Sequence, residues 1–196
     1  MRSWHVDCCV MLGSVKVILI NGSFGVGKST VARALHAAWP RSAVYDPELA
    51  GAALWRLARW VPLRGSDTDD FQDMPAWRHS VVLGTRALCL VHRGPIIVPM
   101  TFDNPAYFRE VWHGIRSFDP SALAYCLTAT PATVRARLSA RGTDPDGAWI
   151  SRRVQECLQA HVDDQFGVRI NSDGRSADEV AQDIITRLEA TEARSV

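Results

Sequence analysis

The sequence of 196 residues lacks any apolar run approaching 18 residues, which excludes a membrane-spanning helix of ordinary length. It also lacks an excess of charge of either sign, because 22 basic residues face 21 acidic ones and leave a formal net charge of +1. Neither nucleic acid nor an anionic membrane is therefore expected as a partner. The 5 cysteines form no C-x-x-C pair, which disfavours disulfide and zinc frameworks and favours a reducing, cytoplasmic environment.

The length predicts one domain with a full hydrophobic core, preceded by a short leader. Residues 1–14 do not read as a signal peptide, because polar side chains interrupt the apolar segment and no cleavage pattern follows. Met11 is a candidate start residue as well as Met1. We expect a loose leader over 1–14 and a single domain over 15–196, and the sequence indicates no oligomeric state.

The most informative stretch is VKVILINGSFGVGKST, residues 15–30. A short apolar run, typical of a buried strand, leads into G-x-x-x-x-G-K-S, and a glycine-free segment with helical character follows. In such a loop the glycines let backbone N–H groups turn toward a phosphate chain, Lys28 supplies a mobile charge, and the Ser29 hydroxyl can ligate Mg²⁺. The predicted ATP-binding residues are Gly22, Ser23, Phe24, Gly25, Val26, Gly27, Lys28, Ser29 and Thr30.

Apolar runs and amphipathic segments alternate along the rest of the chain, which favours an α/β fold with a parallel sheet covered on both faces. We predict a three-layer P-loop kinase fold with five strands, an acceptor-side helical region at about 47–92 and a small helical lid at about 137–153. The predicted strands lie at 15–20, 42–46, 95–100, 122–127 and 168–170, and the predicted helices at 29–39, 48–60, 74–91, 106–116, 131–141, 150–166 and 176–189.

Asp46 ends the predicted strand after the phosphate loop's helix, where ligands bind beyond the carboxyl ends of parallel strands. We interpret it as a general base for an attacking hydroxyl, or as a Mg²⁺ ligand through water; the alternative is a cap for the next helix. Glu48 could share this site, or simply favour the helix dipole. No acid follows the strand IIVPM, where Thr101 stands instead, which disfavours a motor ATPase or a switch GTPase.

Arg137 and Arg141 lie four residues apart and therefore share a helix face. Arg152 and Arg153 open the next predicted helix, across a tip rich in glycine, proline and aspartate. Arginines on two hinged helices could clamp the transferring phosphoryl group and ATP. The alternative is a pair of solvated helix faces, the usual position of surface arginines.

The polar stretch at 64–73 predicts a mobile loop on the substrate side. An acceptor pocket could be lined by Phe71, Gln72, Trp77 and Arg78. Gln72 could pair with an amide or a uracil-like edge. Most aromatic side chains in this part of the chain are equally consistent with core packing. The candidate substrate-binding residues are Asp46, Glu48, Phe71, Gln72, Trp77, Arg78 and Thr101.

Over about residues 15–188 the motifs NGSFGVGKS, YDPE, DDFQDMPAWR and IIVPMT resemble the tunicamycin-resistance protein family, and the layout is more distantly similar to chloramphenicol phosphotransferase and shikimate kinase. The resemblance implies a P-loop kinase-like fold, ATP binding and resistance to a nucleoside antibiotic that carries a uracil and a fatty acyl chain. In related kinases, the position of Asp46 holds the general base, and the positions of Arg137 and Arg141 hold lid arginines.

Three functions remain open on these observations. The first is an ATP- and Mg²⁺-dependent phosphotransferase acting on a small-molecule hydroxyl, with tunicamycin or a nucleoside-like compound as acceptor. In that mechanism Asp46, Lys28, Arg137 and Arg141 are the catalytic residues. The second is ATP-dependent sequestration of the antibiotic without chemistry. The third is a kinase for a metabolite or nucleoside.

Overall fold

The computed structural model describes residues 15–48 and 70–193. The predicted leader, the predicted helix beyond Glu48 and most of the polar loop at 64–73 lie outside the described residues. The domain boundaries expected from the sequence therefore stay a prediction.

The described strands form one parallel sheet in the order β2-β3-β1-β4-β5. The central strand β1 pairs with β3 on one side and with β4 on the other, so that the phosphate-loop sequence begins in the middle of the sheet. This arrangement confirms the predicted five-stranded parallel α/β fold. The strands are β1 (Val17–Gly22), β2 (Ala43–Val44), β3 (Ile96–Pro99), β4 (Leu123–Thr128) and β5 (Val168–Asn171).

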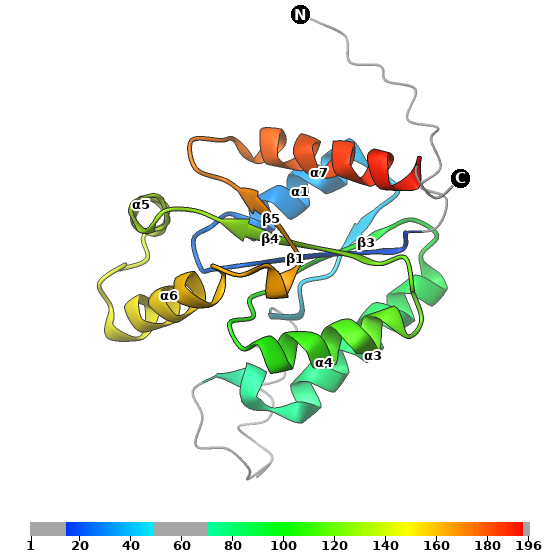
Figure 1. The fold of residues 1–196 in the computed structure, drawn as a ribbon, viewed down its shortest axis with the longest axis horizontal. Helices are drawn as coiled ribbons and strands as arrows, with labels where there is room; N and C mark the ends of the chain where they lie inside the picture. Colours follow the sequence, from blue (N-terminus) through cyan, green and yellow to red (C-terminus); the bar gives the residue numbers. More distant parts are fainter. Residues whose placement is uncertain (1–14, 49–69, 194–196) are drawn as a thin grey trace, which may run out of the picture.

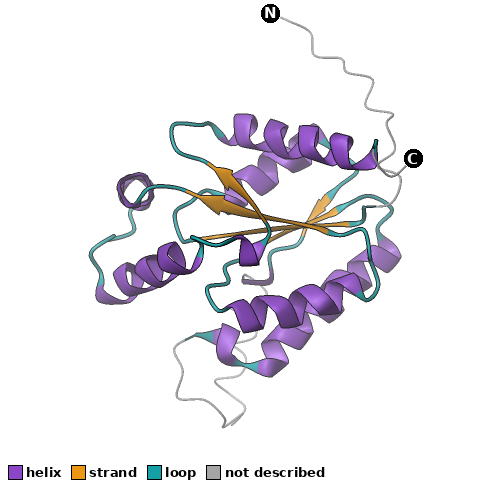
Figure 2. Cartoon of the chain, viewed as in Figure 1, coloured by secondary structure: helices purple, strands orange, loops and turns teal. Residues whose placement is uncertain are grey.

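Helices cover both faces of the sheet, as Figures 1 and 2 show. Successive side chains of a strand point to opposite faces, and β1 follows this rule: Ile18 and Ile20 join one core cluster, and Val17 and Leu19 join the other. Helices α1 (Lys28–Ala38) and α7 (Ala177–Glu192) supply the first cluster, whereas α3 (Pro75–Val91) and α4 (Pro105–Arg116) supply the second. No helix in 15–48 or 70–193 is long and apolar enough to cross a membrane.

Two further helices, α5 (Pro131–Ala140) and α6 (Ala148–Ala160), lie together at one end of the sheet (Figure 1). The predicted cap of α5 is confirmed, because the Thr130 side chain accepts a hydrogen bond from the Thr133 N–H. The capping box predicted at the start of α7 is also present, between Ser176 and Glu179. A groove of about 530 Å³ separates α5 from α6.

The predicted helix at 150–166 is wrong at its C-terminal end, because α6 stops at Ala160. His161 and Phe166 are both buried, and a short 3₁₀ helix, η2 (Asp164–Phe166), connects them. Burying both side chains turns the chain back to the core, so tertiary contacts override the local helical pattern.

The predicted apolar face of α3 is confirmed as far as Leu88, which packs against the second core cluster. Trp77 and Val81 are buried, whereas Val91 is 81% exposed. The buried side chains of α3 end at Thr85, so the last turn extends beyond the core although its apolar spacing continues.

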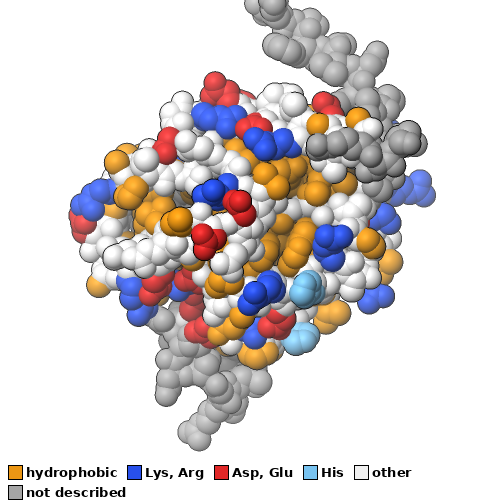
Figure 3. All heavy atoms as spheres, viewed as in Figure 1, with side chains coloured by type: hydrophobic (Ala, Val, Ile, Leu, Met, Phe, Trp, Pro, Cys, Tyr) orange, Lys and Arg blue, Asp and Glu red, His pale blue; other side chains and the backbone are white. Residues whose placement is uncertain are grey.

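Hydrophobic side chains also appear on the molecular surface at the centre of the face in Figure 3, with basic and acidic side chains around them. On this side of the molecule a groove of about 660 Å³ lies between α4 and the strands β4 and β5. Its lining includes Trp112, whose ring lies 5.8 Å from the Arg116 guanidinium carbon. This groove is lined by none of the residues of the phosphate loop.

Candidate functional site

The loop between β1 and α1 has the backbone conformation that its glycines permit. Gly22, Gly25 and Gly27 have φ angles of 152°, 74° and 109°. A Cβ on Gly22 would lie 2.8 Å from the Leu127 carbonyl oxygen, and a Cβ on Gly25 would lie 2.9 Å from Leu138 Cγ. Larger residues at these positions would displace the loop from β4 and α5, so its shape depends on glycine.

Lys28 lies at the start of α1, with its side chain folded back over this loop. The Lys28 ammonium donates a hydrogen bond of 3.1 Å to the Ser23 carbonyl oxygen and lies 5.6 Å from the centre of the Phe24 ring. Gly27 is the N-cap residue of α1 and, being glycine, gives the first-turn N–H groups no side-chain capping hydrogen bond. The combination of helix N-terminus and lysine attracts an anion.

These residues fit a phosphate chain and its magnesium ion. Glycine at positions 22 and 25 lets the loop lie close to Leu127 and Leu138 while it keeps the positive φ angles that a phosphate-binding loop needs. Ser29 is exposed beside Lys28 and offers a hydroxyl oxygen of the kind that Mg²⁺ binds. Within the described residues no group of three or more His, Cys, Asp or Glu side chains could hold a metal by itself, so phosphate oxygens would complete the coordination.

Arg137 connects α5 to the phosphate loop and to the segment after β5. Its guanidinium donates to the Val26 carbonyl oxygen at 2.7 Å, and to the Ser172 hydroxyl and carbonyl oxygens at 3.0 and 2.7 Å. A cavity of about 290 Å³ lies beside it, also lined by Gly27, Thr30 and Arg141. The predicted site residues Arg137 and Arg141 therefore meet next to the phosphate loop.

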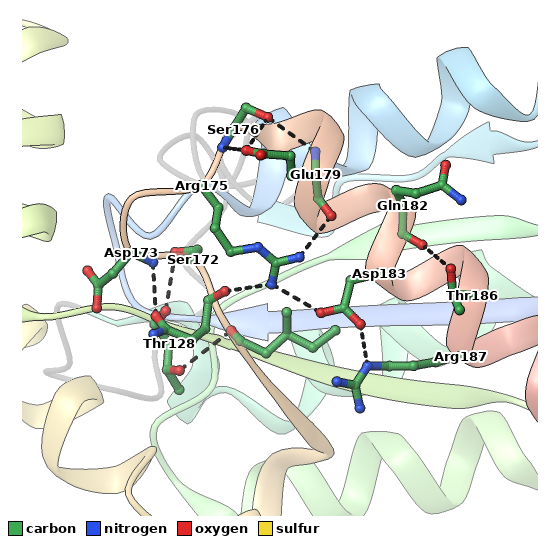
Figure 4. A network of polar contacts seen from close by, with 12 residues as sticks. Thr128, Ser172, Asp173, Arg175, Ser176, Glu179, Gln182, Asp183, Thr186 and Arg187 are labelled. Atoms are coloured by element: carbon green, nitrogen blue, oxygen red, sulfur yellow. Dashed lines mark hydrogen bonds and ion pairs between the residues drawn. The ribbon is translucent and has the colours of Figure 1, made fainter. Parts of the chain in front are cut away.

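The segment after β5, residues 172–176, is held in place by the network in Figure 4. The Asp173 carboxylate accepts hydrogen bonds from the Thr130 N–H and hydroxyl. The Thr133 hydroxyl, and then these bonds from Thr130, lower the pKa of Asp173. Arg175 donates to Asp183, which also pairs with Arg187. A rigid segment beside the cavity next to Arg137 can supply a fixed surface for a nucleotide base.

Asp46, Glu48 and Thr101 lie at the carboxyl edge of the sheet. Asp46 Oδ1 accepts a hydrogen bond of 3.0 Å from the Glu48 N–H, the geometry of a helix cap. The Glu48 carboxylate in turn accepts one of 2.6 Å from the Thr101 N–H, just after β3. The Thr101 hydroxyl is buried, with no hydrogen-bond partner among the described residues.

The predicted acceptor residues after the polar loop lie in different environments. Trp77 is 4% exposed and packs in the core against Phe102. Arg78 is also buried; it donates to the Gln72 carbonyl oxygen at 2.6 Å and pairs with Glu110 at 2.7 Å. Of these predicted residues, Gln72 lines a cavity of about 470 Å³. The side chain of Phe71 lies outside the described residues.

Arg153 in α6 contacts residues far away in the sequence. Its guanidinium pairs with Asp103 at 2.7 Å, with Glu156 at 3.0 Å and with Asp70. Sequence analysis did not identify Asp70 or Asp103 as members of a site. Asp103 follows the end of β3 closely, and this position at the carboxyl edge of the sheet could have indicated it. Arg152, the other arginine predicted here, is exposed.

Two buried polar residues were also missed. Asn21 precedes the first glycine of the loop, and its side chain pairs with the backbone of Phe102. His161 Nε2 lies 2.7 Å from the same carbonyl oxygen. Burial lowers the pKa of His161, and Lys28 adds to this effect, so the ring is neutral at pH 7.

Comparisons with known proteins agree with this geometry. A model of the AAA domain family matches residues 18–160. The structure of the Deinococcus radiodurans tunicamycin resistance protein is similar, with 29% sequence identity and a TM-score of 0.72 over 89% of this chain and 95% of that chain. This similarity confirms the resemblance inferred from the sequence motifs. A search of curated protein sequences finds no match.

More distant structures share the fold. An unliganded sugar kinase from Janibacter sp. HTCC2649 is 19% identical, with a TM-score of 0.64 over 89% of this chain and 95% of that chain. Shikimate kinase from Acinetobacter baumannii, in complex with shikimate, is 14% identical, with a TM-score of 0.58 over 90% of this chain and 94% of that chain. At these identities the likeness concerns the P-loop kinase-like fold alone.

Proposed function

Because this chain belongs to the AAA domain family, we propose that it is an ATP-dependent phosphotransferase that acts on a hydroxyl of a small molecule and confers resistance to tunicamycin. The observation that carries the proposal is the glycine-shaped loop around Lys28 at the N-terminus of α1. The similarity to the D. radiodurans tunicamycin resistance protein supports the choice of antibiotic.

Residues Gly22 to Thr30 would hold the phosphates of ATP. When bound, Mg·ATP supplies the phosphoryl group and the metal charge that balances it. Lys28 would leave its contact with the Ser23 carbonyl oxygen to meet the terminal phosphates, and the Ser29 hydroxyl would bind the metal. Arg137 and Arg141 would stabilise the transferring charge from the α5 side, with Arg137 also keeping the loop in position through Val26.

Asp46 is the proposed base that accepts the proton of the attacking hydroxyl, or a metal ligand through water. Its position after β2, at the carboxyl edge of the sheet, supports this role. Glu48 and Thr101, joined by their hydrogen bond, would form one wall of the acceptor site next to it. The proposed acceptor side also includes Phe71, Gln72, Trp77 and Arg78. Trp77 and Arg78 are buried, so they would fix the shape of this side from within the core.

ATP-dependent sequestration of the antibiotic is the second candidate, and one contact favours it. The hydrogen bond from the Glu48 N–H to Asp46 is that of a helix cap, which needs no catalytic role for the carboxylate. In that case ATP would close the predicted lid, at about 137–153, and the drug would be held unchanged. A kinase for a metabolite or nucleoside is the third candidate.

The decisive experiment is incubation of the protein with Mg·ATP and tunicamycin, followed by mass spectrometry of the drug. A gain of one phosphate supports the phosphotransferase. Tight binding with an unchanged mass supports sequestration and removes the proposed chemistry. A panel of hydroxylated acceptors, assayed for ADP release, tests the metabolite kinase.

The proposed place of action is the cytoplasm, the compartment that supplies ATP. Cys89, Cys126 and Cys157 are free thiols, as expected in a reducing environment. The proposed partner is a small molecule, with no nucleic acid involved.

A further inference from the structure

The groove of about 660 Å³ between α4 and the strands β4 and β5 lies at the amino-terminal ends of these strands. Its position follows from their register. The first pair between them joins Tyr125 to Val168, so the first two residues of β4, Leu123 and Ala124, extend beyond the start of β5. The phosphate loop follows the carboxyl end of β1, so this groove belongs to the opposite edge of the parallel sheet.

The floor of the groove is apolar. Phe108 and Ala122 line it and are each 3% exposed. The Trp112 ring, which is partly buried, stacks on the Phe108 ring with 6.2 Å between the ring centres. Val168, on the strand side of the groove, is 49% exposed. The volume lies in the range of small-molecule pockets, and a recessed floor fits a small ligand better than a flat membrane surface.

Basic side chains border this apolar floor. Arg109 and Arg116 lie two helical turns apart, on the face of α4 that also carries Trp112. Arg169 lines the groove from β5 and pairs with Asp164, the single acidic residue among the described residues that line it. Arg116 lies over the Trp112 ring, but neither Arg109 nor Arg116 pairs with a carboxylate of the described residues. The lining therefore carries two positive charges that no acid of the lining balances.

The groove between α5 and α6 provides a contrast within the same molecule. Its lining is also largely apolar, but its arginine, Arg135, pairs with Asp146, so its charge is balanced. Exposed arginines are common and do not indicate a ligand by themselves. At the groove beside α4, unbalanced positive charge and a recessed apolar floor occur together. This combination complements a ligand that has an apolar part and a negative charge.

We propose that the groove beside α4 binds a free amphipathic carboxylate, a small molecule with an apolar body and one carboxylate group. The apolar body would cover Phe108 and Trp112 on the floor. The guanidinium of Arg109 or Arg116 would donate two parallel hydrogen bonds to the carboxylate at the rim. The inference goes beyond the proposed function, because this groove shares no lining residue with the phosphate loop and its ligand needs neither ATP nor an acceptor.

Three probes that share a naphthalene ring test the charge preference: naphthoate, naphthalenemethanol and naphthylmethylammonium, which are anionic, neutral and cationic. Their dissociation constants would be measured with the full chain, without nucleotide, by saturation-transfer NMR at pH 7. We expect naphthoate to bind about fivefold more tightly than the alcohol, the effect of one exposed ion pair, and the ammonium probe to bind most weakly. Equal binding of naphthoate and the alcohol, tighter binding of the ammonium probe, or no binding of naphthoate overturns the proposal.

Variants of the two arginines locate the preference. Both residues are exposed, so the fold should tolerate the double variant Arg109→Gln/Arg116→Gln. In it naphthoate and the alcohol should bind equally, and Arg116→Glu should shift the preference toward the ammonium probe. Arg33→Gln makes the same neutralising substitution at an exposed arginine of α1 and should leave the preference for naphthoate unchanged. The same preference in the double variant and in Arg33→Gln would place the binding elsewhere and overturn the assignment.

The phosphate loop is itself a candidate anion site, and Lys28→Ala separates the two sites. We expect naphthoate to keep its affinity in Lys28→Ala and in the presence of saturating Mg·ATP. Loss of naphthoate binding under either condition would assign the probe to the phosphate loop and overturn the proposal. Binding of the protein to anionic lipid vesicles that the double arginine variant abolishes, without any binding of free naphthoate, would assign the groove to a membrane surface and also overturn it.

Discussion

The Asn21 side chain pairs with both backbone groups of Phe102. Its Oδ1 accepts the Phe102 N–H at 2.7 Å, and its Nδ2 donates to the Phe102 carbonyl oxygen at 3.1 Å. Both residues are completely buried. The pair of Asn21 and Phe102 connects the C-terminal end of β1, just before the phosphate loop, to the segment that carries Thr101 and Asp103. It therefore aligns the phosphate side of the site with the acceptor side.

Replacing Asn21 with Ala should destabilise the protein by about 1–3 kcal/mol, because the buried Phe102 N–H would lose its acceptor, whereas the Phe102 carbonyl oxygen would keep its contact with His161. Chemical denaturation monitored by circular dichroism measures the change. Gln182→Ala, on the exposed face of α7, is the matched control and should stay within about 0.5 kcal/mol of the parent protein. Similar losses in the two variants would contradict the structural role of Asn21.

Gly25 and Gly142 form a second matched pair, because their φ angles are 74° and 73°. Alanine at either position costs about 1–2 kcal/mol of left-handed strain. At Gly25 the new Cβ would also lie 3.0 Å from the Val134 carbonyl oxygen, whereas nothing lies within 4 Å at Gly142. Gly25→Ala should therefore cost about 1–3 kcal/mol more than Gly142→Ala. It should also weaken ATP binding in calorimetry, and an unchanged ATP affinity would contradict the proposed loop.

Lys28→Ala should reduce phosphoryl transfer more than Asp46→Asn. Positioning and charge stabilisation supply roughly 7–11 kcal/mol of a barrier, whereas a general base contributes about 10²–10⁴-fold in rate. Initial rates of ADP formation with the acceptor present measure both. Lys16→Ala, a change at an exposed lysine before β1, is the control. Parent-like rates for both Lys28→Ala and Asp46→Asn would remove the mechanism.

Arg137→Lys should weaken ATP binding about tenfold, because an ammonium group cannot bridge the Val26 carbonyl oxygen and Ser172 as the planar guanidinium does. Arg135→Lys makes the same substitution in α5 at an exposed ion pair with Asp146 and should have little effect. Isothermal titration with Mg·ATP compares the two. Equal affinities would show that Arg137 does not position the loop.

His161 should make the protein less stable at mildly acidic pH. Burial depresses the pKa of His161 in the folded state, so below about pH 6.5 the unfolded chain binds more protons than the folded one. The stability that the neutral ring contributes is complete above that pH and is lost as pH falls through the folded-state pKa. Urea unfolding at pH 7.5 and 5.5 measures the loss, which His161→Gln should reduce. His113→Gln, at an exposed histidine of α4, should keep the parent's pH dependence.

Much of the fold could be predicted because its signals are local. The buried strand before Gly22, the cap at Thr130 and the capping box at Ser176 each depend on a few neighbouring residues. The errors arise where distant contacts decide the outcome. Helix α6 ends early because the side chains of His161 and Phe166 are buried in the core. The apolar spacing of α3 continues to Val91, although that side chain is exposed.

The candidate site divides in the same way. The phosphate loop is contiguous, so its glycines and Lys28 could be identified from spacing alone. The ion-pair cluster of Arg153 with Asp70 and Asp103 draws on three separate segments, and no sequence pattern connects them. Asn21 was missed because a single amide before a glycine carries no signal until its partner, Phe102, is known.

The central position of β1 in the sheet also affects how the nascent chain folds. Val17 pairs with Ile96, and Ile18 pairs with Leu123, so both neighbours of this strand emerge from the ribosome long after it does. Until then an apolar segment with two open edges is exposed on the nascent chain, a condition that favours aggregation. The strand that presents the phosphate loop is thus the one whose folding waits longest for its partners.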